Sequence, residues 1–149
     1  SLVSRRTAGG EGRAGVRGVK ALFRDMPDVD GFISVDGVRL TRITAGGTGS
    51  RRFEFVFKGP GGHSFGAFGL PSAIHAMGRA IALIAELRTP QFPRTTFTVG
   101  TVSGGTSVNS IAAEAAFAID MRSNESSSLA IFERQAKQAA LRAVDEENQ

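Results

Sequence analysis

The chain has 149 residues, of which 41% are hydrophobic, so it is long enough to bury the core of one domain. It contains no cysteine, which excludes disulfides and thiolate sites and is compatible with a reducing compartment, and we expect a cytoplasmic location. The net charge of +4 comes without a long basic run, and no apolar run reaches the ~18 residues of a membrane-spanning helix. The composition therefore argues against nucleic-acid and membrane partners.

The first part of the chain predicts one helix and one strand. Residues 1–14 are rich in Gly and Arg and are expected to form a loop, and a short helix is expected from Val16 to Asp25. Residues 30–36 hold a β-rich run that ends in the turn-forming pair Asp36-Gly37. The residue type alone favours a turn role for Asp36, although an acidic side chain at a strand end is also well placed to point into a cleft.

The Gly-rich residues 45–50 predict a boundary between a segment over 1–47 and a domain over 48–149. Arg51 to Lys58 alternates apolar and polar residues, which is typical of a half-buried strand. One face of this strand is expected to carry Phe53, Phe55 and Phe57.

The loop that follows, Gly59 to Ser64, holds three glycines and a proline and carries His63, one of two histidines in the chain. A helix with a wide apolar face is expected from Ser72, as its N-cap, to about Arg88. An isolated histidine in a loop is more often structural or solvated than catalytic, so His63 does not establish a function by itself.

The second half of the chain predicts strands over Thr95–Val102 and Ile111–Met121, and then a helix capped by residues 123–126 that frays from Asp145. From residue 51 the order is β-α-β-β-α, which is the ferredoxin-like pattern without its last strand. We therefore expect an α/β fold of the α+β type, with an antiparallel sheet and two helices on one face. In this topology Arg51–Lys58 would be an open edge.

Three polar residues at the ends of these elements predict a pocket. His63 follows two glycines, Asn109 follows the pair Gly104-Gly105, and Arg122 ends a strand two residues after Asp120. Taken singly, Asn109 is a turn residue and Arg122 an exposed partner for Asp120. Together, an imidazole, an amide and a guanidinium suit a carboxylate or an oxyanion. The chain has no phosphate-binding loop and no helical His pair.

Four segments in order resemble the dimerisation or lid domain of co-catalytic zinc exopeptidases, a family that includes aminoacylases, carboxypeptidases, tripeptidases and N-carbamoyl amino-acid hydrolases. The four segments are Gly59-Pro-Gly-Gly-His-Ser64, Leu70-Pro-Ser-Ala-Ile74, Val102-Ser-Gly-Gly-Thr-Ser-Val-Asn-Ser-Ile111 and Asp120-Met-Arg122. The resemblance covers residues 51 to about 145. It implies that His63 of one subunit donates to the scissile carbonyl oxygen in the partner's active site, and that Asn109 and Arg122 hold the substrate carboxylate.

The resemblance extends upstream, to a remnant of the α/β catalytic domain. Thr7-Ala-Gly-Gly-Glu-Gly12 is similar to the family's Gly-Glu-Glu-Gly segment, which makes Glu11 a zinc ligand and puts Gly10 where the general base stands. Asp36 corresponds to a second zinc ligand. The other ligands of the family's two zinc ions are not in this sequence, so we expect the chain alone to hold no zinc and to hydrolyse nothing. The first residue, Ser1, and the missing strand predict a segment of a longer chain.

The leading hypothesis is the lid portion of a zinc-dependent amidohydrolase or peptidase that acts on small peptides or N-acyl amino acids. The resemblance implies a homodimer through strand Thr95–Val102 and helix Ser72–Arg88. Whether the chain is an enzyme is left open, because its sequence fits both a fragment of such an enzyme and a degenerate relative of the family. Two alternatives are a non-catalytic binding or assembly module derived from that family and an unrelated ferredoxin-like domain that binds amino acids.

Overall fold

The structure is a computed structural model that describes residues 17–28, 30–32, 41 and 47–149. The chain divides into two compact units, Ser1–Ile43 and Thr44–Gln149. In the first unit, the helix expected from the sequence is present as α1, Arg17–Asp25. The rings of Phe23 and Phe32 meet edge to face nearby, with centroids 5.3 Å apart. Most of the strand expected over 30–36, with Asp36, lies outside the described residues.

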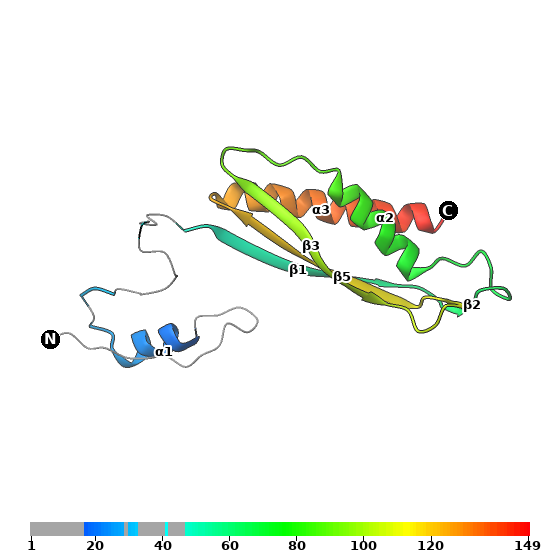
Figure 1. Cartoon of the computed structure of the whole chain (residues 1–149), viewed down its shortest axis with the longest axis horizontal. Coiled ribbons are helices and arrows are strands. Elements are labelled where there is room, and N and C mark those ends of the chain that lie inside the picture. Colours follow the sequence, from blue (N-terminus) through cyan, green and yellow to red (C-terminus); the bar gives the residue numbers. More distant parts are fainter. Residues whose placement is uncertain (1–16, 29, 33–40, 42–46) are drawn as a thin grey trace. The chain divides into compact units, whose positions relative to one another are not determined.

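The second unit contains a three-stranded antiparallel sheet in the order β1-β5-β3 (Figure 1). β5 (Glu114–Ser123) is central and pairs with β1 (Gly49–Lys58) along its whole length. On its other side it pairs with β3 (Thr95–Gly104) across a bulge. This is the order that a ferredoxin-like fold gives its first three strands, so that prediction is confirmed. In the described sheet, β1 and β3 are the outer strands.

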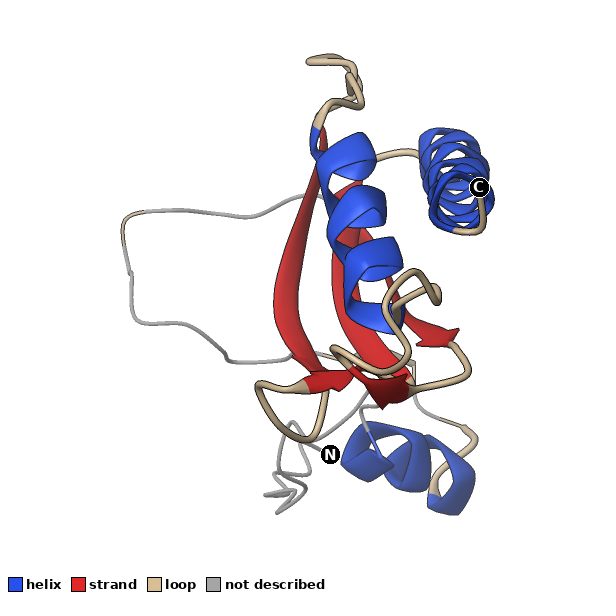
Figure 2. Ribbon diagram, turned by 90° about the vertical axis from the view of Figure 1, so that its right-hand side faces the viewer, coloured by secondary structure: helices blue, strands red, loops and turns tan. Residues whose placement is uncertain are grey.

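Two helices, α2 (Ala73–Ala85) and α3 (Ser126–Glu147), lie on the same face of this sheet, as predicted (Figure 2). None of the described helices is long and apolar enough to cross a membrane. Both helices bury alanines, whose small side chains let their backbones approach each other closely. The helices contribute these buried side chains: Ala73, Ala76, Met77, Ala80, Ile84, Leu129, Phe132, Ala136, Ala140 and Ala143.

Successive side chains of a strand alternate between the two faces of its sheet, and Phe117 of β5 lies on the buried face, at the centre of the core. Its ring stacks on Phe55 and Phe57 of β1, with centroids 5.0 Å and 5.9 Å apart. Phe97 of β3 meets Phe132 of α3 with centroids 4.4 Å apart. The alternation predicted for Arg51–Lys58 is confirmed, and the opposite face carries exposed side chains such as Arg52, Glu54 and Val56.

Several predicted boundaries were wrong for local reasons. α2 ends at Ala85 rather than Arg88, because Leu87 N–H bonds the carbonyl of Ile84 and tightens the chain before Pro90. The strand expected over Ile111–Met121 is divided into β4 (Ser110–Ile111) and β5, since the carbonyls of residues 112 and 113 accept hydrogen bonds from another loop. β3 extends to Gly104, two residues beyond the expected end.

The predicted N-cap positions of both helices are confirmed, but neither cap makes a side-chain hydrogen bond, and the predicted end of α3 was wrong. Ser72 occupies the N-cap position of α2, but its side chain makes no capping hydrogen bond. The N-cap of α3 is Glu125, and Ser123 accepts a hydrogen bond from the Glu125 N–H at 3.2 Å. α3 does not fray from Asp145 but continues to Glu147, whose carboxylate is held by contacts with α2.

Candidate functional site

The loop between β1 and α2, residues 59–72, is closed at its base. Its first residue, Gly59, donates its N–H to the Ala113 carbonyl at 2.9 Å, and Ala73, just after its last residue, donates to the Ala112 carbonyl at 3.0 Å. The two ends therefore share one anchor, the connection between β4 and β5. Such a closed base holds the loop as a compact unit on the end of the sheet.

His63 lies in this loop, in the two-residue strand β2 (Gly62–His63), which pairs with β4. His63 is opposite Ser110 in the register, and the N–H of Ser64 donates to the carbonyl of Asn109 at 3.0 Å. The structure thus brings together two of the three residues predicted for a pocket, His63 and Asn109. They come from segments far apart in the sequence.

Gly62 shows why this pairing needs glycine. Its φ is +152°, and a Cβ built on it would lie 2.8 Å from the Cβ of Ala67. The loop therefore folds back on itself directly over the residue before His63, and any side chain larger than hydrogen at Gly62 would push it apart.

The imidazole of His63 has a defined donor side. Its Nδ1 accepts a hydrogen bond from the N–H of Phe65 at 3.3 Å, and the side chain is exposed. In a neutral imidazole, one nitrogen accepts and the other carries the proton, so this contact leaves the proton on Nε2. The exposed Nε2–H can then donate to a carbonyl oxygen or an oxyanion.

The amide of Asn109 is oriented in a similar way. The Oγ of Ser107 donates to Asn109 Oδ1 at 2.9 Å and lies 2.6 Å from the Oγ of Ser110. Because Oδ1 is already an acceptor within its own turn, the Nδ2 group is left as the donor. His63 and Ser110 also line an open concavity of about 660 Å³, together with Gly104, Thr106 and Glu114. The described loops can therefore present N–H donors beside a space large enough for a small molecule.

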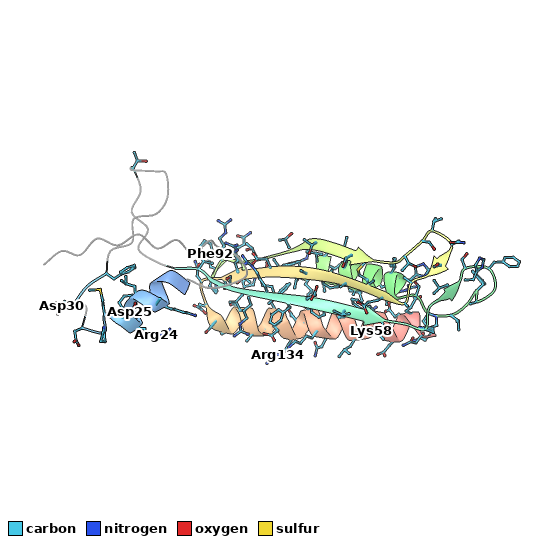
Figure 3. All side chains as sticks on the ribbon, turned by 90° about the horizontal axis from the view of Figure 1, so that it is seen from below. Arg24, Asp25, Asp30, Lys58, Phe92 and Arg134 are labelled. Atoms are coloured by element: carbon cyan, nitrogen blue, oxygen red, sulfur yellow. The ribbon has the colours of Figure 1, made fainter. Side chains whose placement is uncertain are left out.

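Arg122 lies far from these two residues within one chain. It is near the end of β5, whereas Glu114, which lines the concavity, is at the beginning. At ~3.4 Å per residue, the strand between them is about 27 Å long. In Figure 3, Lys58 marks the end of the sheet near the His63 loop and Phe92 marks the opposite end. One chain therefore does not bring Arg122 to His63 and Asn109.

Arg122 is held by the ion pair that its residue type suggested. Its Nε donates to Asp120 Oδ2 at 2.7 Å, and the Nε of Arg52 donates to Asp120 Oδ1 at 2.8 Å. The hydrogen bonds from Arg122 and Arg52 hold the pKa of Asp120 below its usual range. Both guanidiniums keep their terminal amino groups as donors on the open face of the sheet, where the Arg side chains are 54% and 62% exposed.

The described residues do not form a metal site. No group of three His, Asp or Glu side chains in the described part of the chain is arranged to hold a metal ion. The predicted ligands Glu11 and Asp36, and Gly10 at the base position, lie outside the described residues.

The sequence analysis missed the residues that orient the predicted ones. The Phe65 N–H acts through its backbone, so no side-chain pattern could reveal it. Ser107 could have been found, since a serine two residues before Asn109 in a turn often bonds to a neighbouring side chain or backbone group. Arg52 becomes visible only once the strand register places it opposite Asp120.

A family model for the peptidase dimerisation domain matches residues 46–147. No curated protein sequence matches the chain. Among solved structures, an aminobenzoyl-glutamate utilization protein from Klebsiella pneumoniae matches with a TM-score of 0.62 at 17% identity, covering 67% of this chain and 26% of that one. A hydantoinase/carbamoylase family amidase from Burkholderia multivorans matches with a TM-score of 0.59 at 21% identity, covering 67% and 25%.

The aminopeptidase PepT from Bacillus cereus matches with a TM-score of 0.58 at 20% identity, covering 67% of this chain and 26% of that one. At such identities these structures establish the shared fold, and the chain spans about a quarter of their length. The family model matches about two-thirds of the chain, over the whole of the sheet and both of its helices. The chain therefore belongs to the peptidase dimerisation domain family.

Proposed function

We propose that the chain supplies the dimer interface and the substrate-binding lid of a zinc-dependent amidohydrolase or peptidase that acts on small peptides or N-acyl amino acids. The observation that carries this proposal is the pair of oriented donors, His63 Nε2 and Asn109 Nδ2, on two joined loops of a peptidase dimerisation domain, with His63 lining an open concavity. His63 would donate to the carbonyl oxygen of the scissile amide. Asn109 would donate to the substrate carboxylate.

The self-association would use β3 and α2. β3 is an outer strand of the described sheet, and its unpaired N–H and C=O groups suit pairing with a second copy. α2 exposes Ile74, Gly78 and Ala82 along one face, and these mostly small residues let another helix approach closely. These features support an antiparallel, edge-to-edge dimer.

An antiparallel pairing of two β3 strands also accounts for the distance to Arg122. Thr96 lies beside Arg122, and Gly104 lies in the concavity near His63. A two-fold axis across β3 sets the Thr96 end of one strand against the Gly104 end of the other. One substrate would then meet His63 and Asn109 of one protomer and Arg122 of the other, so the complete site requires the dimer.

The parent enzyme would use zinc as a Lewis acid that activates the attacking water. Glu11 and Asp36 are the candidate ligands within this chain, and Gly10 stands at the position of the general base. Among the described residues no group of three donors is arranged for a metal, and Glu11 and Asp36 lie outside them.

A titration tests the proposal directly on the ¹⁵N-labelled chain. N-acetyl-L-alanine should shift the signals of His63, Asn109 and Arg122 with a Kd of about 1 mM or weaker, since a small exposed site gives only a few kcal/mol. N-acetyl-L-alanine amide, which lacks the carboxylate, should shift His63 alone. Asn109→Ala and Arg122→Ala should each weaken the acid's binding, whereas Arg134→Ala on α3 should not. Equal shifts with the acid and the amide would refute the assigned carboxylate contacts.

A further inference from the structure

Glu147, in the last turn of α3, has a side chain that is only 9% exposed. Its Oε1 accepts a hydrogen bond from the Ser72 N–H at 3.0 Å and lies 3.3 Å from Nδ1 of His75. Its Oε2 accepts a hydrogen bond from Nε of Arg79 at 3.0 Å. Both oxygens of this carboxylate are therefore occupied by groups of Ser72 and of the first two turns of α2.

These contacts place an anion at the start of α2, next to an N-cap residue whose side chain makes no capping hydrogen bond. Ser72 is the N-cap, with φ −105° and ψ 127°, yet its own side chain makes no capping hydrogen bond. Free N–H groups and the positive end of the helix dipole favour an anion at this position. Here the anion comes from Glu147, a residue 75 positions later in the chain.

Ser72 is also the last residue of the loop that carries His63. Inside this loop, the Ala67 N–H donates to the His63 carbonyl at 2.9 Å, and the Leu70 N–H donates to the Ala67 carbonyl at 3.1 Å. Pro71, which has restricted backbone freedom, then leads to Ser72. A short series of backbone contacts thus runs from Glu147 to His63, whose side-chain direction matters for the candidate site.

The carboxylate stays ionised because its partners outweigh its burial. Burial raises the pKa of Glu147, but the hydrogen bonds from Ser72 and Arg79 and the charges of His75 and Arg79 bring it below its usual range. The neighbouring acid on α3, Glu146, bonds instead to Arg142 at 2.7 Å. At neutral pH, Glu147 is thus a charged anchor between the two helices.

We propose that Glu147 is a positioning residue: it holds the closing end of the loop at Ser72 and thereby fixes the direction of the His63 imidazole. Its importance for turnover rests on the proposed function, but its effect on the loop does not. The hydrogen bond from Ala73 to Ala112 does not involve Glu147, so removal of Glu147 should loosen the loop without unfolding the sheet.

The test combines site-resolved amide exchange with the ¹⁵N shifts of His63 in the whole chain. Glu147→Ala should speed exchange of the amides between Ser64 and Ser72 by about tenfold or more and leave β1 and β5 unchanged. The His63 signals should move from the Nε2–H form towards a mixture of both tautomers. Glu147→Gln keeps an acceptor for Ser72 but loses the charge for Arg79, so its effects should be intermediate.

Glu146→Ala is the matched control, because it removes an acid from the same helical turn without touching α2, and both measurements should stay at wild-type values. Wild-type exchange and His63 shifts in Glu147→Ala would overturn the proposal. A uniform increase of exchange throughout the sheet would also overturn it, since Glu147 would then contribute only global stability. Neither measurement needs substrate, so a failed titration would leave this result unaffected.

Discussion

The N–H of Ser64 donates to the carbonyl oxygen of Asn109 at 3.0 Å, and this hydrogen bond joins the two loops that carry the candidate donors. The contact lies at the end of the two-residue pairing between β2 and β4. It explains how His63, which lines the concavity, and the turn that carries Asn109 come to lie together.

Gly104 is expected to be the least replaceable of the described glycines. Its φ is +146°, and an added Cβ would lie 2.6 Å from the Cα of Ala115, which cannot move aside as a flexible side chain can. Gly104→Ala should lower the free energy of unfolding by about 2–4 kcal/mol in urea denaturation. The control is Gly66→Ala, where an added Cβ also meets nothing within 4 Å and the φ is not in the left-handed region. It should change the unfolding free energy by less than about 1 kcal/mol. Equal effects of the two substitutions would contradict the close approach of β3 to β5.

Phe117 and Phe65 should differ sharply although both are phenylalanines. Phe117 is 1% exposed and stacks on two rings, whereas Phe65 is 91% exposed. Phe117→Ala should lower the unfolding free energy by about 3–5 kcal/mol, and Phe65→Ala should change it by less than about 0.5 kcal/mol. Thermal melts followed by circular dichroism would measure both. A large loss of stability in Phe65→Ala would mean that the loop packs differently.

Stability should fall as the pH is lowered. The folded-state pKa values of Asp120 and Glu147 lie below their unfolded values. A carboxyl of this kind contributes stability that is fully present above its unfolded pKa, about 4, and is lost as the pH falls through its folded pKa. Urea midpoints should therefore be flat from about pH 7 to 5 and decrease below that range. Asp120→Asn should flatten part of the decrease, and a wild-type curve that rises towards acid pH would contradict these ion pairs.

Arg122 should matter for binding more than for stability. Its ion pair with Asp120 is half exposed, and such pairs contribute less than about 1 kcal/mol. Arg122→Ala should therefore keep the wild-type urea midpoint within that margin while weakening the binding of N-acetyl-L-alanine. Arg52→Ala removes the other guanidinium on Asp120 and is the matched comparison. A loss of stability in Arg122→Ala as large as its loss of binding would assign this residue a structural role only.

The sequence was sufficient to predict the sheet because the alternation of apolar and polar residues in its strands is strong. The alternation around Phe53, Phe55 and Phe57 located β1 and its buried face, and the order of elements predicted the strand order. The division between β4 and β5 was not predictable. It depends on hydrogen bonds that the N–H groups of Gly59 and Ala73 donate to the carbonyls of residues 113 and 112, which connect the two strands. Ser72 was predicted correctly as the N-cap of α2, but the hydrogen bond from its N–H to Glu147, 75 residues away, follows from no local pattern.

The residue types of the candidate site were predictable from the sequence, but their positions relative to one another were not. His63 and Asn109 lie on joined loops, but Arg122 lies about 20 Å along β5 from Ala116, the nearest residue of this strand that lines the concavity. The sequence alone does not indicate this separation, because it depends on the length of β5 and on the end of the sheet at which each loop lies. The distance makes the dimer a requirement of the proposed site.

The oligomeric state of the chain tests this requirement most directly. Sedimentation velocity over a range of protein concentrations should show a dimer for the wild-type chain. Ala82→Arg, which places a charge on the exposed face of α2, should be a folded monomer with no affinity for N-acetyl-L-alanine. Gln138→Arg, which places the same charge on the exposed face of α3, should stay dimeric. A wild-type chain that stays monomeric at the highest concentration would contradict the proposed dimer and its shared site.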